Sequence, residues 1–142
     1  MKLSTISQAR LNTCHQDLRL IFSEAIKVTL VDFGIAEGHR TVERQQQLFK
    51  EGKSQIDGVT RLGKHNYNPS MAVDIYGWVN GKTCYDERTL CYLAGTIMAV
   101  AGTLLNQGRI THELVSGLNW DGDGEIITDQ KFQDLVHFEL DE

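Results

Sequence analysis

The chain has 142 residues, of which 41% are hydrophobic and 23% charged, and its formal net charge is −5 at pH 7. This length and composition predict one globular domain over residues 1–142 with a buried core, and they exclude a disordered chain. A nucleic-acid-binding protein would need a basic surface, and no basic cluster stands out, so no nucleic-acid partner is expected.

The N-terminal residues 1–10 lack the apolar stretch of a secretory signal, and no membrane span is expected. Cys14, Cys84 and Cys91 are scattered and form no Cys-x-x-Cys pair, so neither a zinc ribbon nor a redox motif is indicated. We therefore expect a cytoplasmic protein with free thiols that does not insert into membranes and that something else must release.

The first third of the chain is expected to form two helices with a strand between them. Residues 7–27 carry apolar side chains every three or four positions, which predicts a helix with one buried face. Residues 28–37 are rich in β-branched and aromatic side chains, which predicts a strand. Residues 41–51 should form the second helix, with Gly52 at its C-terminal cap. The apolar stripe of the first helix consists of Leu11, Cys14, Leu18, Ile21 and Ala25.

A long polar stretch follows the second helix. Residues 53–68 are expected to form a loop at the edge of a cleft, and this loop would deliver His65. Residues 72–76 predict a short buried strand that carries Asp74. The Asn-Gly pair within residues 78–82 favours a tight hairpin turn, so the sheet should be at least partly antiparallel.

The second half of the chain predicts one long helix and two strands. The helix covers residues 89–106, and a strand over residues 109–115 would include His112. From Val136 onward apolar and polar residues alternate, which predicts a half-buried strand with His137 on its polar face. The expected fold class is therefore α+β: a small, mainly antiparallel sheet packed by two or three helices, with a cleft on its other side.

Two histidines and one aspartate stand out as candidate ligands. His65, Asp74 and His137 would form a three-ligand set for a catalytic zinc ion, which keeps its fourth position for water. An aspartate between two apolar residues of a strand needs a partner, and a metal ion supplies one. Asp134 would then be free to act as a base. Against this, a single histidine near a chain end is more often structural or exposed.

Three segments resemble the LAS family of zinc peptidases. His65 followed by Ala-Val-Asp74, and Asp134-x-x-His137 followed by Glu-Leu, are similar to the family's two metal-site patterns. Gly38-His-Arg-Thr and the glutamines at residues 45–47 are similar to its arginine and glutamine segment. The loop between His65 and Asp74 is longer than is usual in the family. The resemblance covers residues 35–140 and is strongest to single-domain phage endolysins.

The resemblance implies a LAS- or hedgehog-like fold and a zinc peptidase that cuts the peptide stem of peptidoglycan at the L-Ala–D-Glu bond. Such an endolysin would be a monomer that waits in the host cytoplasm and acts on the cell wall after release. The alternative within the family is a D-Ala-D-Ala carboxypeptidase or dipeptidase. From another class, the chain could be an inactive wall-binding or calcium-binding module. The implied roles are zinc binding by His65, Asp74 and His137, base catalysis by Asp134, and substrate binding by Arg40 with help from Gln46. The neighbouring Gln45 and Gln47 are equally polar alternatives to Gln46.

An acidic loop over residues 119–130 has the spacing of an EF-hand-type calcium site. Its last position is Gln130 instead of the usual bidentate glutamate, so the alternative is an acidic surface turn. The candidate calcium ligands are Asn119, Asp121, Asp123 and Asp129.

Overall fold

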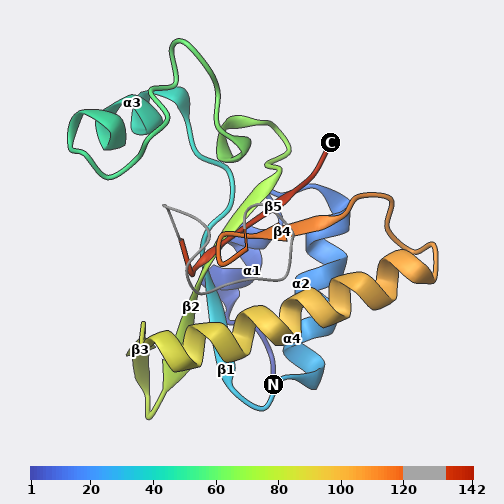
Figure 1. The fold of residues 1–142 in the computed structure, drawn as a ribbon. Coiled ribbons are helices and arrows are strands. Elements are labelled where there is room, and N and C mark those ends of the chain that lie inside the picture. The colour runs from blue at the N-terminus through green and yellow to red at the C-terminus, as the bar shows by residue number, and fades with distance from the viewer. Residues whose placement is uncertain (120–133) are drawn as a thin grey trace.

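The computed structural model describes residues 1–119 and 134–142 (Figure 1). They form an α+β fold with a small antiparallel sheet, as the sequence predicts. The elements in chain order are α1 (Thr5–Leu11), α2 (Gln16–Val28), β1 (Asp32–Glu37), α3 (Val42–Lys50), the 3₁₀ helix η1 (Lys64–Asn66), β2 (Ala72–Val79), β3 (Lys82–Cys84), α4 (Glu87–Asn106), β4 (Leu114–Ser116) and β5 (His137–Leu140).

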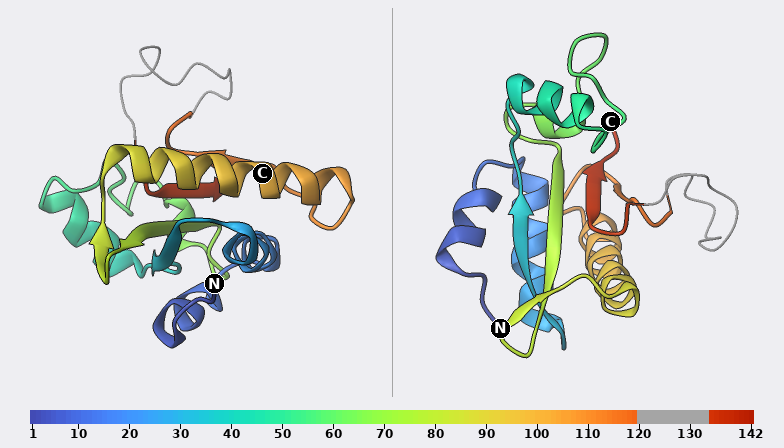
Figure 2. Two further views of the ribbon diagram at one scale, coloured as in Figure 1. Left: turned by 90° about the horizontal axis from the view of Figure 1, so that it is seen from below. Right: turned by 90° about the vertical axis from the view of Figure 1, so that its left-hand side faces the viewer.

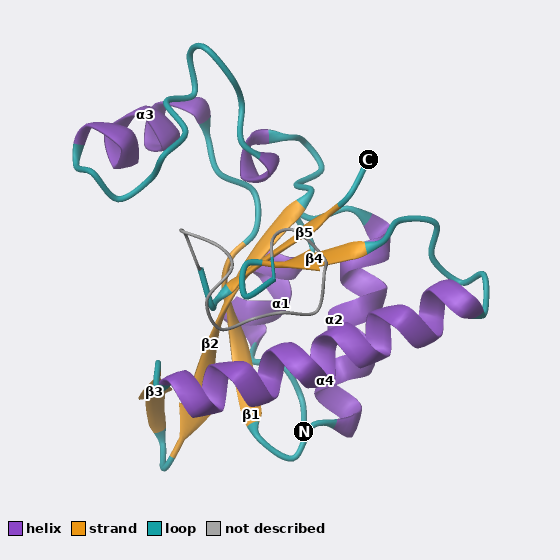
Figure 3. Cartoon of the chain, viewed as in Figure 1, coloured by secondary structure: helices purple, strands orange, loops and turns teal. Residues whose placement is uncertain are grey.

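The strands run in the order β1-β2-β5-β4, with β3 paired to β2, and each of these pairs is antiparallel (Figure 3). The β2–β3 hairpin turns at Asn80 and Gly81, which both have positive φ, as the predicted Asn-Gly turn requires. Within the β2–β5 pair, Asp74 lies directly opposite His137. This register joins two candidate ligands that are 63 positions apart in the sequence.

The core lies between one face of the sheet and the helices α2 and α4. Phe22 of α2 packs edge-to-face against Phe33 of β1 and Phe138 of β5, with ring centroids 6.3 Å and 5.6 Å apart. Burying one such ring stabilises a fold by roughly 1.5–3 kcal/mol. Phe138 and Leu140 are fully buried in this core, and because side chains alternate along a strand, His137 lies on the opposite face.

Helix α3 and the long loop after it stand apart from the helices of the core. In Figure 1 and in the right-hand view of Figure 2 they project beyond one end of the sheet. Thr41 caps α3 by accepting a hydrogen bond from the Arg44 N–H, and Gly52 follows the helix with a φ of 74°. The predicted second helix and the predicted loop of residues 53–68 are both confirmed.

Three sequence-based element predictions are wrong in detail. The strand predicted over residues 28–37 begins only at Asp32, because α2 extends to Val28. The helix predicted over residues 7–27 is divided into α1 and α2, because Ser70 pairs with the backbone at Cys14 and the ring of His15 caps the start of α2. The strand predicted over residues 109–115 begins only at Leu114. His112 therefore lies in the preceding loop, where it contacts Asp17.

Helix α4 is long and apolar enough to cross a membrane by length and composition alone. This is weak evidence, because a core helix of a globular protein passes the same test. Leu93 and Ile97 of α4 are fully buried in the core cluster. The expectation that the chain does not insert into a membrane stays a prediction.

Candidate active site

The three predicted metal ligands meet on the sheet face that points away from the core. His65 comes from η1, Asp74 from the centre of β2 and His137 from the start of β5. Their ligand atoms all lie within 4.8 Å of one another. Asp74 Oδ1 is 3.2 Å from His65 Nε2 and 3.0 Å from His137 Nδ1, so one carboxylate oxygen faces both imidazole rings.

The outer nitrogens of both rings are already committed as hydrogen-bond donors. His65 Nδ1 donates to the Gly38 carbonyl over 2.7 Å, and His137 Nε2 donates to Glu139 over 2.9 Å. In neutral imidazoles the inner nitrogens would then carry lone pairs, and both would point at the same carboxylate oxygen. Such an arrangement needs a cation between the three groups, either a proton or a metal ion. The donor set, two imidazole nitrogens and one carboxylate, fits zinc.

Neighbouring charges shift the pKa values of His137, Asp74 and Glu139. Burial would lower the pKa of His137, but its contacts with Asp74 and Glu139 raise that pKa to about 9. Burial would raise the pKa of Asp74, but hydrogen bonds from His137 and His65 hold it well below its usual range. Glu139 has a lowered pKa, because the effects of His137 and Lys64 outweigh its burial. Glu139 contacts the outer nitrogen of the His137 ring, where a carboxylate can orient the imidazole.

Asp134 lies beside the cluster without joining it. It lines the same cleft, and burial, followed by the negative charge of Asp74, raises the pKa of Asp134 above its ordinary value. Its backbone is held by Gly117, whose carbonyl accepts from the Asp134 N–H over 3.1 Å. A Cβ at Gly117 would lie 2.1 Å from the Asp134 carbonyl oxygen, so only glycine allows this approach. Gly117 was not identified from the sequence.

Arg40 is placed at the same cleft by the segment that carries His65. The Arg40 N–H donates to the His65 carbonyl over 2.8 Å, and the Asn66 side chain donates back to the Arg40 carbonyl over 3.0 Å. The Arg40 guanidinium binds Glu37 and Gln45, and it lies 3.6 Å from Asp74 Oδ2.

The structure brings Gln45, rather than Gln46, to the cleft. Gln45 is 1% exposed, and it accepts from Arg40 and donates to Ser54 and to the Ile56 carbonyl. It thereby ties Arg40 to the long loop. Gln46 is half-buried and does not line this cleft.

The cleft that contains these groups has a volume of about 460 Å³. The sheet supplies its acidic floor, with Asp74, His137 and Glu139. The loop of residues 53–64 supplies a wall that includes Arg61 and Lys64. A peptide segment could therefore lie between an acidic, metal-binding floor and a basic wall.

A second histidine–aspartate cluster, formed by His15, Asp17 and His112, has a structural explanation. Asp17 Oδ2 accepts hydrogen bonds from the backbone and side chains of Thr111 and His112, over 2.8–3.3 Å. The His15 ring accepts the Asp17 N–H as a helix cap. These hydrogen bonds fasten the start of α2 to the loop before β4.

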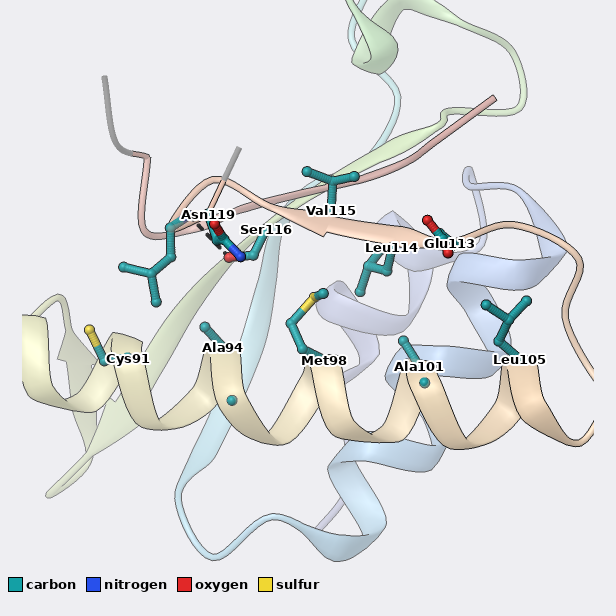
Figure 4. Close-up of a pocket in the computed structure, with 13 residues that line it drawn as sticks. Cys91, Ala94, Met98, Ala101, Leu105, Glu113, Leu114, Val115, Ser116 and Asn119 are labelled. Carbon is teal, nitrogen blue, oxygen red and sulfur yellow. Dashed lines mark hydrogen bonds between the residues drawn. The ribbon is translucent and has the colours of Figure 1, made fainter. Parts of the chain in front are cut away.

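A separate cavity of about 560 Å³ lies between α4 and β4 (Figure 4). Its lining is mainly apolar, with Ala94, Met98 and Leu105 on α4 and Leu114 on β4, and the described residues that line it do not include the histidine–aspartate cluster or Asp134. Asn119 lies at one end of it. The other candidate calcium ligands, Asp121, Asp123 and Asp129, lie outside the described residues, and calcium binding stays a prediction.

Comparisons with known proteins identify a family and a similar fold. The model of a family described as phage L-alanyl-D-glutamate peptidase matches residues 1–141. Among solved structures, the crystal structure of the Serratia marcescens L-Ala D-Glu endopeptidase ChiX is similar with a TM-score of 0.77 and 21% sequence identity. The match covers 99% of this chain and 90% of that chain, and at this identity it supports the fold alone. No curated protein matches significantly in sequence.

Proposed function

The chain belongs to the phage L-alanyl-D-glutamate peptidase family and is a peptidase of that linkage in peptidoglycan; we propose that it works with a zinc ion held by His65, Asp74 and His137. The sequence left two bonds as candidates for cleavage, L-Ala–D-Glu and D-Ala–D-Ala. The family is one of peptidases that cleave L-Ala–D-Glu. We further propose that the protein acts as a monomer on the host cell wall, after release from the cytoplasm.

One observation carries the zinc proposal: Asp74 Oδ1 faces the inner nitrogens of two imidazoles whose outer nitrogens are committed elsewhere. Zinc bound there would polarise the scissile carbonyl and activate the attacking water. Gly38 and Glu139 fix the orientation of the two rings, which is the usual role of acceptors behind metal-binding histidines.

Asp134 is proposed as the general base. Its raised pKa suits a group that accepts a proton from the attacking water and then passes that proton to the leaving amine. The backbone contacts with Gly117 hold it at the cleft beside His137 without using its carboxylate. The low pKa of Asp74 keeps that side chain ionised for its different task.

Arg40 is proposed to bind substrate oxygen. Of the five N–H groups of a guanidinium, three are directed at Glu37 and Gln45. The two that remain can donate to the developing oxyanion or to a substrate carboxylate. Gln45 takes the supporting role that the sequence assigned to Gln46.

The experiment is to digest purified peptidoglycan and to identify the new termini by mass spectrometry. New N-terminal D-glutamyl residues and new C-terminal L-alanine are expected. Release of D-alanine without new glutamyl N-termini would instead support the carboxypeptidase alternative, and binding to the wall without any cleavage would support a wall-binding module.

A further inference from the structure

Among the described residues, four cationic side chains line the cleft, and they differ in whether a protein group already compensates their charge. Arg40, Lys53 and Lys64 each contact acidic or polar groups of the protein. Arg61 also lines the cleft, but its guanidinium contacts no partner among residues 1–119 and 134–142. The partners are Glu37 and Gln45 for Arg40, Glu51 for Lys53, and Leu140 and Glu139 for Lys64.

The loop holds the backbone of Arg61 in place although its side chain is exposed. Asp57 Oδ1 accepts hydrogen bonds from the N–H groups of Val59 and Thr60, both over 2.9 Å, and a longer one of 3.4 Å from Arg61. Asp57 Oδ2 accepts from the Thr60 hydroxyl over 2.6 Å. The start of the loop is fixed by Gln45, so a defined turn presents Arg61 at the cleft wall.

The substrate supplies an anion for this cation. A glutamyl residue has two carboxyl groups, and the stem peptide can continue through only one of them. The other is close to the scissile bond, either as a free carboxylate or capped as an amide. A guanidinium fork binds a carboxylate with two parallel hydrogen bonds, whereas an amide offers one acceptor oxygen and directs its own N–H donors at the guanidinium.

We propose that Arg61 is a specificity-determining residue that receives the free carboxylate of the substrate's D-glutamyl residue and so favours stem peptides in which this group is not amidated. The inference rests on the proposed function. Arg61 lies on the loop wall of the cleft with Lys53 and Lys64, so a substrate carboxylate that is not at the metal site meets positive charge there. Because Arg61 is the cation of that wall without a partner among residues 1–119 and 134–142, it gains most from the pairing.

The test compares kcat/KM for two synthetic stem peptides that share the L-Ala–D-Glu bond and differ only in a free or amidated second carboxyl. Wild type should prefer the free carboxylate by about 10-fold or more, as for a hydrogen bond to a charged group. Arg61→Gln should remove this preference while keeping the rate on the amidated peptide. Arg61→Lys keeps the positive charge but lacks the planar guanidinium, so it should retain part of the wild-type preference. Arg44→Gln, the same change at an exposed arginine of α3 that does not line the cleft, should behave as wild type.

A high salt concentration should shrink the wild-type preference, because an exposed ion pair is screened. Arg61→Gln that keeps the full preference would overturn the assignment to Arg61. Equal cleavage of both peptides by wild type would show that the cleft does not distinguish carboxylate from amide. Both results leave the proposed function intact, since the bond is cut. Wild type that cuts neither peptide, and no peptidoglycan stem, would contradict the proposed function and the inference together.

Discussion

Asp74 and Asp134 line one cleft, but their surroundings move their pKa values in opposite directions. Two carboxylates separated in this way can serve as metal ligand and base at the same pH. Asp134→Asn should therefore retain zinc and the fold while losing roughly 10²–10⁴-fold in kcat, the usual contribution of a general base. The measurement is kcat on a stem peptide, with zinc content and circular dichroism of the same sample. Zinc lost together with activity would make Asp134 a ligand instead.

Glu139 has its main contact with the outer nitrogen of His137. Glu139→Gln removes the charge that favours donation from His137, so zinc affinity should fall about 10- to 100-fold, as for other groups behind metal-binding histidines. Titration against a competing chelator measures this. Glu113→Gln, at an exposed glutamate next to β4, provides the control and should leave the affinity unchanged. Equal affinities for Glu139→Gln and wild type would reduce Glu139 to a surface carboxylate.

The sequence could not identify Gln45 as the glutamine that supports Arg40. Residues 45, 46 and 47 are all glutamine, so composition and spacing do not separate them. Only the rotation of α3 relative to Arg40 does so, and that rotation is set by packing and by the loop hydrogen bonds of Gln45. Gly117 was missed for a similar reason, because its close contact with Asp134 joins the two ends of the connection between β4 and β5, and the sequence does not show that these ends meet.

At the scale of elements, alternation along residues 136–140 predicted the face that His137 occupies. It did not predict the strand partner, since period-two alternation contains no information about pairing. The β2–β5 register that sets Asp74 opposite His137 required the structure. The division between α1 and α2 was hidden because the apolar spacing continues through it, and Leu11, Cys14 and Leu18 are all buried as a continuous stripe would be.

The contact between α2 and the loop before β4 should make stability depend on pH. Burial would raise the pKa of Asp17, but hydrogen bonds from His112 and Thr111 hold it below its ordinary value. A lowered folded-state pKa adds stability that is fully present above the unfolded value of about 3.9 and is lost as the pH falls through the folded value.

Asp17→Asn should therefore lower the free energy of unfolding by about 1.5–3 kcal/mol at pH 6, the range for hydrogen bonds to charged groups. The difference in the free energy of unfolding between wild type and Asp17→Asn should be smaller at pH 3. Urea denaturation at both pH values measures it, with Asp141→Asn, at an exposed C-terminal aspartate, as the control. A difference that is the same at both pH values would mean that the ionised carboxylate is not the source of the stability.

For the whole molecule, the three candidate ligands come from a 3₁₀ helix and two strands, and they meet only when the sheet is complete. The α+β class and the residue types of the site followed from periodicity and from a family resemblance. Their geometry did not, because it depends on strand register and on the Gly38 carbonyl, which has no sequence signature. A metal that binds only this assembled site should also stabilise the fold by mass action.

The central claim is that zinc at His65, Asp74 and His137 is required for cleavage. The most direct measurement is zinc content together with peptidoglycan cleavage, before chelation, after chelation and after zinc is added back, for wild type, His65→Ala and His112→Ala. Wild type should contain one zinc per chain, lose activity on chelation and regain it when zinc is added back, and His65→Ala should have neither zinc nor activity. His112→Ala, in the other histidine–aspartate cluster, should keep both. Full zinc occupancy and activity in His65→Ala, or cleavage that survives complete removal of the metal, would contradict this claim.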